Sequence, residues 1–576
     1  MNNGTPGVPT ATGHLSVDDP DGADTFVAVT TPTNSSLGLG RYTITAAGDW
    51  TYVLNDTNSL VQALGAGDQI ADRFTVRSAD GTTQLVSVTI QGADDNPVAK
   101  ADAAFVAAGG TVSIDVLGND TDPEHGALAI AAVGEAAHGT VSISGGRITY
   151  TPNSSYSGPD TFNYTVRDPT GLESSAAVSV IIGVANHAQV GGDTFLQGNY
   201  MEMGVSAAGS LGSANAAPSG YHPHGVAGAT GGISYVVDLD GFSTGAPATA
   251  GDFTLPGTPE DAMVVGFNGR NYVQDERVGG LNDLHTSTTD TSAGGRLQST
   301  TIGTADGLSY RQVINLDPNA TYYTTTITLT NTSAAVMTDV RFMRSFDPDQ
   351  DYDRYGAFST QNDVLTNPSA GHDLAIVQAL GINSGVSVNL VALDPRAVAS
   401  NFGFTNHNVY AAAAFDTPVD GNGHYADEAI TVGARFGNLA PGAQVSFTYY
   451  TSLNGHAGAN DMVIGSGASE TLNGGGGDDI IFGLGGNDTL TGNIGNDLFV
   501  FAKGLTGATT ITDFSAGAGT DDVIQLRGFG FQDFNEVRTH SVEDSGGLTI
   551  DLGAGEHIRL SGVALSALHP DDVLLV

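Results

Sequence analysis

Five consecutive nonapeptides occupy residues 456–500 and place acidic and apolar residues at fixed positions. The sixth position of each repeat is a carboxylate: Asp461, Glu470, Asp479, Asp488 and Asp497. The eighth position is apolar: Val463, Leu472, Ile481, Leu490 and Phe499. Glycine fills most of the intervening positions: Gly474, Gly476, Gly477, Gly483, Gly485, Gly486, Gly492 and Gly495. Five repeats in one register predict a repeated unit of turn and strand rather than an ordinary Gly/Asp-rich loop.

This arrangement suits a hard cation. Glycine adopts positive φ without steric cost, so it allows a tight turn whose carbonyl groups point inward. The acid adds charged oxygens, and calcium prefers roughly six to eight oxygen ligands. The apolar residue two positions later begins a short strand and fills the core. We therefore expect calcium at these turns.

The repeat length also predicts which acids meet. In a two-sided roll, the turns on one edge come from alternate repeats, so acids 18 residues apart lie in neighbouring layers. The expected pairs are Asp461 with Asp479, Glu470 with Asp488, and Asp479 with Asp497. The last three repeats fit best, although Leu484 replaces a glycine and Asn493 and Ile494 weaken the fifth. We expect one to three well-formed sites.

The pattern resembles the calcium-binding RTX repeat, whose form is G-G-x-G-x-D-x-U-x. This resemblance implies an extracellular or cell-surface location and export by type I secretion machinery. The first residues, MNNGTPGVPTATG, show no basic and apolar signal-peptide pattern. The apolar ending DDVLLV (Asp571 to Val576) is expected to belong to a C-terminal export signal.

Composition excludes several functional classes. The chain has 62 acidic and 19 basic residues, a net charge of −43, so we expect no nucleic-acid partner. This acidity indicates a solvated extracellular surface, carboxylates that bind divalent cations, or both. The absence of cysteine excludes disulfides and thiolate metal sites. No run of about 18 apolar residues occurs, so no transmembrane segment is expected.

Two small β-sandwich modules are predicted at residues 8–96 and 97–186. In the first, YTITAAGDWTYVL (Tyr42–Leu54) alternates around a turn, and Asp80–Gly81 joins two further strands. This order of segments resembles a VCBS-type repeat of bacterial surface adhesins. The second module, with SIDVLGNDTDPEHGAL and alternation at Phe162, Tyr164 and Val166, resembles a cadherin-like module. Acids near their joint either bind calcium or form turns: Asp18, Asp19, Asp21, Asp94, Asp95, Asp120 and Asp122.

Residues 187–455 are dense in strand patterns and almost free of helical period. Phe447 and Tyr449 alternate with Thr448 and Tyr450, which predicts a strand with one face in the core. The segment predicts one large antiparallel β-sandwich domain, a ligand-binding domain by this interpretation. The chain is therefore expected to be all-β, ending in a parallel β-roll over 456–500 and a roll cap over 501–576. In the cap, Asp513, Asp521 and Asp522 are further calcium candidates.

The middle domain carries one conspicuous acidic segment, SFDPDQDYDRYG. Its alternate residues resemble the first half of a D-x-D-x-D calcium loop: Asp347, Asp349, Asp351 and Asp353. A solvated acidic turn and a catalytic carboxylate pair are the alternatives. His222 and His224 lie two apart, but no third zinc ligand accompanies them at a diagnostic spacing. No catalytic motif is present, so no catalytic residue is assigned.

We expect a calcium-dependent, type I secreted adhesin or cell-surface-associated protein. Its middle domain would bind a glycan or another surface polymer, to which strand tyrosines would contribute: Tyr322, Tyr323, Tyr352, Tyr355, Tyr410, Tyr425 and Tyr450. One alternative is an exported polysaccharide-degrading enzyme, either a lyase or a hydrolase. Another is a structural component of a surface layer or biofilm matrix.

Overall fold

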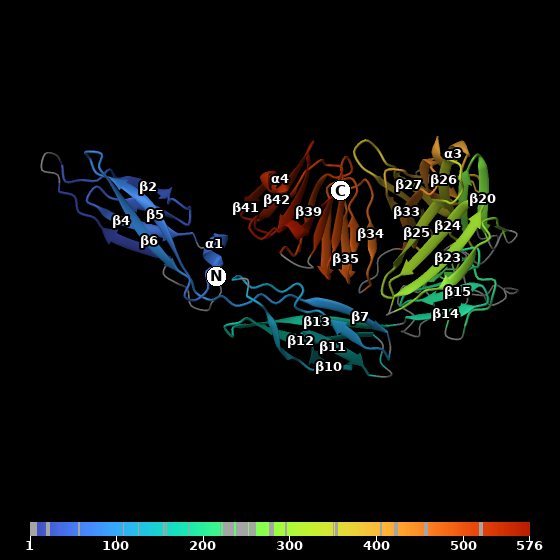
Figure 1. Ribbon diagram of the computed structural model, residues 1–576, viewed down its shortest axis with the longest axis horizontal. Coiled ribbons are helices and arrows are strands. Elements are labelled where there is room, and N and C mark those ends of the chain that lie inside the picture. Colours follow the sequence, from blue (N-terminus) through green and yellow to red (C-terminus); the bar gives the residue numbers. More distant parts are fainter. Residues whose placement is uncertain are drawn as a thin grey trace.

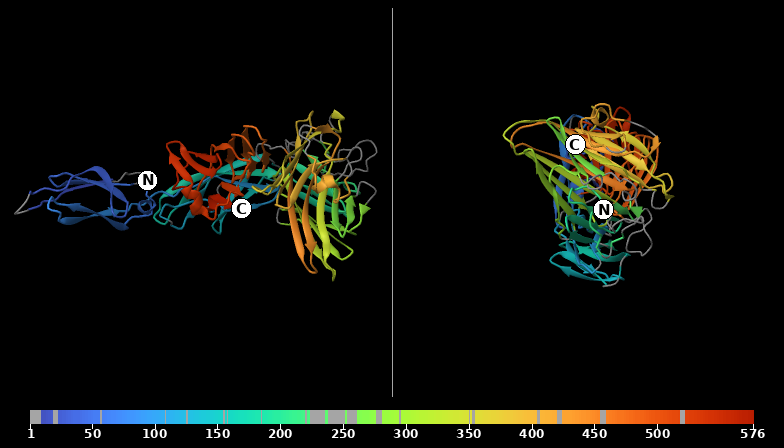
Figure 2. Two further views of the ribbon diagram at one scale, coloured as in Figure 1. Left: turned by 90° about the horizontal axis from the view of Figure 1, so that it is seen from above. Right: turned by 90° about the vertical axis from the view of Figure 1, so that its right-hand side faces the viewer.

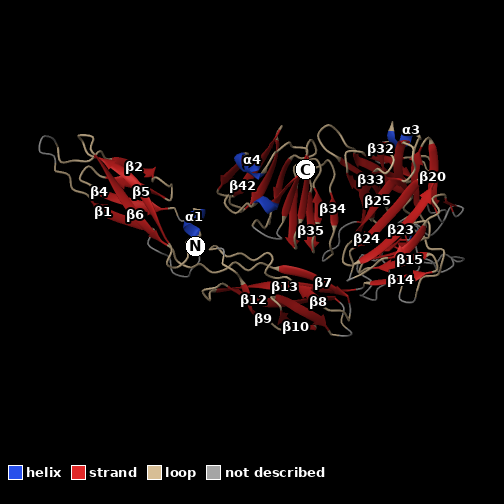
Figure 3. Cartoon of the chain, viewed as in Figure 1, coloured by secondary structure: helices blue, strands red, loops and turns tan. Residues whose placement is uncertain are grey.

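The computed structural model describes most of the chain (Figure 1). The described residues are 9–18, 23–55, 58–107, 109–124, 126–153, 156, 158–183, 185–218, 221–222, 235–237, 251–252, 261–275, 281–293, 296–349, 351, 355–403, 406–419, 424–453, 459–517 and 522–576. Strands dominate and the helices are short (Figure 3), which confirms the predicted all-β class. Within the described ranges, no helix is long and apolar enough to cross a membrane.

The first module packs a four-stranded sheet on a hairpin. The sheet order is β1-β4-β3-β2, and β5 pairs with β6. Phe74 and Val86 of the hairpin pack against Ile44 and Tyr52 of the sheet, and Trp50 adds its ring at 5.6 Å from that of Phe74. The elements are β1 (Thr10–His14), β2 (Val29–Asn34), β3 (Gly40–Ile44), β4 (Asp49–Leu54), α1 (Ser59–Gln62), β5 (Gln69–Arg77) and β6 (Thr83–Gln91). This module lies at one end of the molecule (Figure 2).

The second module is a sandwich of sheets β7-β13-β12-β9 and β10-β11-β8. The predicted alternation is confirmed, because Phe162, Tyr164 and Val166 are buried together with Ile148 and Tyr150 of the opposite sheet. The strands are β7 (Asp102–Ala107), β8 (Val112–Ile114), β9 (Ala129–Val133), β10 (Gly139–Ser144), β11 (Arg147–Pro152), β12 (Gly158–Arg167) and β13 (Glu173–Gly183).

The middle domain packs a six-stranded sheet on a nine-stranded sheet. Their orders are β21-β20-β19-β26-β32-β30 and β22-β23-β24-β25-β33-β29-β28-β27-β31, and a third sheet, β14-β15-β16-β17-β18, precedes them. One continuous core lies between the two large sheets, where Phe342 meets Phe447 and Tyr449. The predicted alternation in the strand of Phe447 and Tyr449 is therefore confirmed.

The elements of this domain follow in chain order. They are β14 (Asn186–Val190), β15 (Asp193–Gln197), β16 (Met201–Val205), β17 (Tyr235–Val237), β18 (Gly251–Asp252), β19 (Asp261–Phe267), β20 (Arg270–Asp275), β21 (Leu281–Asn282), β22 (Ser287–Asp290), β23 (Leu297–Ala305), β24 (Leu308–Leu316), β25 (Tyr322–Asn331), β26 (Met337–Phe346), β27 (Thr360–Thr366), β28 (Leu374–Leu380), β29 (Ser387–Leu393), β30 (Ala397–Asn401), α3 (Ala412–Phe415), β31 (His424–Ala426), β32 (Ile430–Leu439) and β33 (Gln444–Leu453).

The C-terminal region is a roll of two parallel sheets, as predicted. Sheet β34-β36-β38-β40-β44 faces sheet β35-β37-β39-β43, and β42 and β41 extend the second sheet antiparallel. The elements are β34 (Met462–Ile464), β35 (Thr471–Gly476), β36 (Ile480–Phe482), β37 (Thr489–Ile494), β38 (Leu498–Ala502), β39 (Ala508–Ile511), β40 (Val523–Arg527), α4 (Phe534–Thr539), β41 (Ser541–Asp544), β42 (Gly547–Gly553), β43 (Glu556–Ser561), η2 (Pro570–Asp572) and β44 (Val573–Leu575). Both parallel sheets thus continue beyond residue 500.

Candidate functional site

The acids of the repeats lie at the start of the roll strands. Asp461, Asp479 and Asp497 directly precede β34, β36 and β38 on one edge of the roll. Glu470 and Asp488 precede β35 and β37 on the other edge. Because consecutive strands of each sheet are 18 residues apart in this part of the chain, the acids of one edge stack in successive layers.

Hydrogen bonds connect each acid to the layer before it. The backbone N–H of Asp461 donates to Oδ1 of Asp479 at 2.8 Å, and that of Asp479 donates to Oδ1 of Asp497 at 2.9 Å. On the other edge, the N–H of Glu470 donates to Oδ1 of Asp488 at 3.0 Å. These are the three pairs that the repeat length predicts. We call the two stacks together the acid ladder.

The acid in each of the last three repeats has one oxygen that receives no hydrogen bond. In the described part of the chain, Oδ2 of Asp479, Asp488 and Asp497 is buried and accepts no hydrogen bond. Each such oxygen lies over the first glycine of its own repeat. A methyl group added at Gly474, Gly483 or Gly492 would fall 2.1, 2.8 or 1.9 Å from it. Glycine is needed at this position because a side chain would clash with the buried carboxylate. A buried carboxylate oxygen without a hydrogen-bond donor suits a cation that prefers oxygen ligands.

The turn backbone explains further glycine positions. Gly477, Gly486 and Gly495, the fourth residues of their repeats, have φ of 112°, 104° and 143°, a region closed to other residues. The second position also has positive φ, and there Leu484 (φ 56°) and Asn493 (φ 73°) replace glycine. Of the other predicted turn residues, Gly485 packs against the preceding layer and Gly476 ends β35.

Burial controls the protonation of the ladder. Burial, with a contribution from a neighbouring carboxylate (Asp461 or Asp522), raises the pKa of Asp479 and of Asp497 to about 8. Burial also raises the pKa of Asp488. A divalent cation offsets the buried negative charge and displaces these protons, so cation binding and folding of the roll are coupled.

Two acids of the cap segment join the ladder region. Oδ1 of Asp522 accepts the N–H of Asp497 at 3.0 Å, which is the bond that a sixth repeat would make, while its Oδ2 accepts the N–H of Ser515. Asp513 accepts the N–H groups of Gly492 and Asn493. Asp521 lies outside the described residues. Asp522 therefore continues one edge of the ladder with protein donors on both oxygens.

The acidic segment of the middle domain divides between two places. Carboxylate oxygens of Asp347, Asp349 and Asp427 lie within 4.8 Å of one another. Asp351 instead accepts the N–H groups of Asn383 and Ser384 at 2.8 and 2.9 Å. Asp353 lies outside the described residues. The structure therefore gives Asp347 and Asp349 a different third acid from the one that the sequence pattern indicated.

These acids lie at one end of the six-stranded sheet. Register places Asp261 opposite Phe346, the residue before Asp347, and Phe346 opposite Ile430, which follows the segment of Asp427. Asp275 ends the adjacent strand β20, and His407 Nε2 lies 3.4 Å from its Oδ2. A buried ion pair, Arg344 Nε to Asp261 Oδ1 at 2.6 Å, closes this end toward the core.

A second carboxylate–histidine pair lies on the third sheet. Glu202 is fully buried on β16, and its Oε1 is 2.6 Å from Nδ1 of His222. The backbone N–H of His222 donates to Oε2 at 2.8 Å. His224 lies outside the described residues. His222 is thus positioned by a buried acid, a contact that sequence spacing did not indicate.

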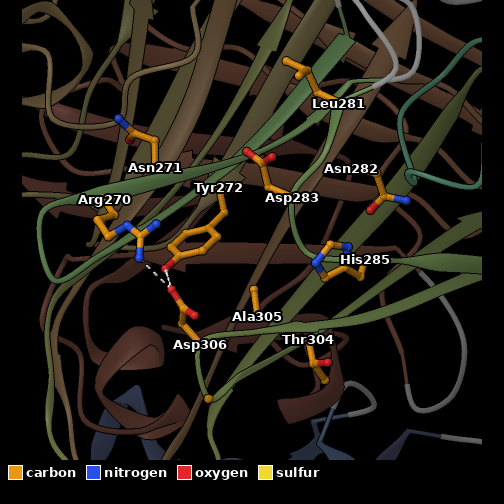
Figure 4. A pocket seen from close by; sticks show the side chains of 11 residues that line it. Arg270, Asn271, Tyr272, Leu281, Asn282, Asp283, His285, Thr304, Ala305 and Asp306 are labelled. Atoms are coloured by element: carbon orange, nitrogen blue, oxygen red, sulfur yellow. Dashed lines mark hydrogen bonds and ion pairs between the residues drawn. The ribbon is translucent and has the colours of Figure 1, made fainter.

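A pocket of about 680 Å³ opens beside strand β20 (Figure 4). Figure 4 shows Arg270 and Tyr272 reaching Asp306, at 2.9 Å and 2.6 Å. Asp283 and His285 also line the pocket. The lining is mostly polar side chains drawn from three segments of the middle domain, namely 270–272, 281–285 and 304–307.

The tyrosines proposed for sugar binding have different surroundings. Tyr323 is buried beside Arg344, while Tyr322 and Tyr450 are partly buried with ring centroids 6.1 Å apart. Tyr410 lies under the guanidinium of Arg341 at 4.9 Å. Tyr352 lies outside the described residues. The two that remain well exposed are Tyr355 and Tyr425, at 47% and 51%.

Comparison with protein families finds two matches. Residues 94–181 match the bacterial Ig domain, and residues 464–499 match the RTX calcium-binding nonapeptide repeat (4 copies). A comparison with curated proteins found no significant match.

Solved structures show weak similarity. A nucleoside hydrolase-related protein from Saccharophagus degradans is 23% identical over 16% of this chain and 26% of its own, with a TM-score of 0.13. A polysaccharide lyase is 11% identical (46% and 33% covered, TM-score 0.22). Cadherin domains of protocadherin gamma B7 are 13% identical (56% and 68% covered, TM-score 0.20). The chain thus spans 26% and 33% of the first two, and these similarities assign no function.

The two family matches coincide with two of the structural units described above. The bacterial Ig match covers the second β-sandwich, and the repeat match covers the glycine turns of the roll. Together with the half-satisfied carboxylates over the glycines, the second match establishes the cofactor. The chain carries a bacterial Ig domain and RTX repeats that bind calcium.

Proposed function

We propose that the protein is a calcium-dependent adhesin or cell-surface-associated protein, exported by type I secretion machinery. The acid ladder is the observation that carries this proposal, because Asp479, Asp488 and Asp497 each keep a buried oxygen for a cation. The Ig domain and the first module, which resembles a VCBS-type repeat, would act as spacers. The middle domain would bind a glycan or another surface polymer.

The ladder would act as a folding switch. Calcium is scarce in the cytosol, where stacked carboxylates repel one another or hold protons and keep the roll open for export. Extracellular calcium is in the millimolar range, which reaches the dissociation constants of about 10⁻⁴–10⁻³ M typical of extracellular modules. Cation binding then contributes directly to the free energy of folding.

The pocket beside β20 is the proposed ligand site of the middle domain. Its volume of about 680 Å³ lies in the range of sites for small ligands. Carboxylates of Asp283 and Asp306 accept hydrogen bonds from sugar hydroxyls, and Arg270 and His285 donate to hydroxyl or carboxylate oxygens. This donor and acceptor set suits a polar polymer better than an apolar ligand.

A glycan array with the full chain, in calcium and in chelator, tests the proposal. We expect binding in calcium that is lost in Asp283→Ala and retained in Asp551→Ala, which removes an exposed acid of the roll segment. Binding unchanged by Asp283→Ala moves the site elsewhere in the domain. The absence of any glycan or polymer binding by folded, calcium-loaded protein contradicts the adhesin proposal.

An exported lyase or hydrolase is the second candidate, and the acidic end of the six-stranded sheet favours it. Asp347, Asp349 and Asp427 are close enough to share a cation, and we propose calcium there as well. Paired carboxylates near Asp275 and His407 are also the groups that acid–base chemistry on polysaccharides uses. Cleavage of a polysaccharide that disappears in Asp349→Asn, with calcium binding by the roll intact, would establish the enzyme.

A further inference from the structure

The roll covers part of the outer face of the nine-stranded sheet. Leu374, Ile376 and Val391 of the sheet form one buried apolar cluster with Phe482 and Val500 of the roll. Around it pack Tyr322, Leu365, Leu393 and Tyr450 from the middle domain and Ile464, Ile480, Leu498 and Leu505 from the roll. Figure 1 shows the β34 side of the roll facing the nine-stranded sheet near β33. The two regions therefore share a hydrophobic core.

Strand β28 is buried on both faces, and the roll covers one of them. Ala375 and Val377 point into the core between the two large sheets, while Leu374 and Ile376 point into the cluster shared with the roll. Because all four side chains are buried, this stretch of the sheet has no solvent-facing side. A strand buried on both faces loses half of its apolar contacts if the roll unfolds.

A buried arginine fastens the same interface. The Arg527 side chain, at the end of β40, donates from Nε to Oδ1 of Asp373 at 2.7 Å and from Nη2 to Oδ2 of the same carboxylate. Nη1 donates to Gln525 at 2.8 Å. A bidentate pair between a buried arginine and a partly buried carboxylate fixes the relative orientation of the two regions as well as their contact.

The middle domain also meets the first acid of the ladder. Backbone bonds join Asn460 to Asn319 (N to O, 2.9 Å) and Thr321 to Asn460 (N to O, 3.0 Å). The hydroxyl of Thr321 donates to Oδ1 of Asp461 at 2.6 Å, and both residues are fully buried. Asp461 in turn donates its N–H to Asp479. The ladder thus ends on a residue of the middle domain.

We propose that calcium bound by the roll also stabilises the middle domain, with Thr321 positioning the first acid of the ladder. A ligand that binds only the folded roll lowers the population of every state in which the roll opens. States in which the nine-stranded sheet opens also expose the shared cluster, so calcium lowers the population of these states as well. The ligand site of the middle domain is then calcium-dependent although it touches no calcium. This inference does not depend on which polymer the middle domain binds, and measuring exchange also in Asp349→Asn separates it from calcium bound at Asp347, Asp349 and Asp427.

Hydrogen exchange measured by mass spectrometry on the full chain tests the coupling. Trp50, the only tryptophan, lies in the first module, so intrinsic tryptophan fluorescence does not report on the middle domain. At calcium about 100 times the dissociation constant, the open state becomes about 100-fold less populated. We expect exchange in β25, β28, β29 and β33 to slow at least about tenfold relative to chelator, as in the roll strands.

The Ig domain is the internal control for this experiment, because its own core shares no member with the roll cluster. Weakening calcium binding by the roll with Asp497→Asn should leave the exchange of the Ig domain unchanged, whether or not the acids at its joint with the first module bind calcium. Protection confined to the roll, with β28 and β29 exchanging equally fast in calcium and in chelator, would overturn the coupling.

A matched pair of threonine variants tests the role of Thr321. Thr321→Val removes the hydroxyl that donates to Asp461, and we expect about tenfold weaker calcium binding, as for loss of one hydrogen bond to a charged group. Thr326→Val, on the neighbouring strand β25, removes an exposed hydroxyl bonded to Thr448 and should leave affinity unchanged. Equal affinities of the two variants in calorimetry would contradict a positioning role for Thr321, whatever the exchange of the native chain shows.

Discussion

The roll and the middle domain both bury carboxylates, but they compensate the charge in different ways. In the middle domain, Oδ1 of Asp261 accepts from Arg344 at 2.6 Å and Oδ2 accepts from the N–H of Leu211 at 2.7 Å. In the roll, Oδ1 of Asp479 accepts one backbone N–H and Oδ2 accepts none. The charge and both oxygens of Asp261 are satisfied by protein groups, whereas Asp479 requires a cation.

This difference separates structural acids from ligand acids better than acidity or burial does. Asp261 and Asp479 are almost equally buried, and burial raises the pKa of both. What distinguishes them is the unmet oxygen and the glycine beneath it, where a side chain would clash. The following changes test that distinction, from the largest expected effect to the smallest.

Removal of calcium should have the largest effect. Chelation leaves the ladder acids of both edges uncompensated, so the strands of the roll should be lost while the Ig domain stays folded. Circular dichroism should show loss of β-structure in chelator, and calorimetry should show heat when calcium is returned. Equal spectra with and without calcium, and no heat, would show that the ladder needs no cation.

The buried ion pair of the middle domain should stabilise the fold independently of calcium. Arg344→Met leaves Asp261 buried without its charged partner, which typically costs about 3–5 kcal/mol. Chemical denaturation should show this loss, and saturating calcium should not restore the wild-type midpoint. Full rescue by calcium would mean that Asp261 also behaves as a ligand.

Single amides in the ladder should have a smaller, local effect. Asp497→Asn and Asp488→Asn retain an oxygen acceptor but lose the charge, and we expect about tenfold weaker calcium binding from each. Asp551→Asn, an exposed acid in the same region, is the control. If all three variants bound calcium alike in calorimetry, position in the ladder would not matter.

The acidic segment of the middle domain allows a comparison between neighbouring residues. Asp349→Asn should remove one calcium-binding event without affecting the ladder. Asp351→Asn should leave calcium stoichiometry unchanged and lower stability by about 1–2 kcal/mol, because the amide serves the turn at Asn383 and Ser384 less well than the carboxylate. Calcium titration of both variants decides whether the predicted loop functions as one site or as two separate structures.

Asp102 of the Ig domain provides the smallest effect, through pH. Burial, with a contribution from Asp120, raises its pKa to about 8, above its value of about 3.8 in the unfolded chain. The stability that the protonated form provides is therefore complete below about pH 4 and is lost as pH rises toward 8. Asp102→Asn should be neutral near pH 4 and stabilise the domain by about 1 kcal/mol near pH 8, a small gain because the side chain is only partly buried. Thermal unfolding at both pH values measures this.

Sequence period predicted the roll because its contacts are local and repeated. A nine-residue unit determines both the strand spacing and the pairing of acids 18 residues apart, and the structure shows those pairs. Alternation likewise identified Phe447 and Tyr449 as core residues. In both cases the position of a residue in the repeat or strand determines the direction in which its side chain points.

Contacts between distant segments were not predictable in this way. No local pattern connects Asp427 with Asp347 and Asp349, because their approach depends on the pairing of β26 with β32. The pattern also failed to indicate that Asp351 accepts hydrogen bonds from a turn that begins 32 residues later. The sequence shows that Leu374 and Ile376 are apolar but not which element covers them.

The interface between the nine-stranded sheet and the roll has a practical consequence for dissecting the chain. A fragment ending near residue 455 would follow the sequence boundary but would leave Leu374, Ile376 and Val391 facing water. Exposed apolar sheet surface of this kind promotes self-association. A soluble middle domain should therefore require the roll to be retained, or these outward-facing positions to be replaced by polar residues.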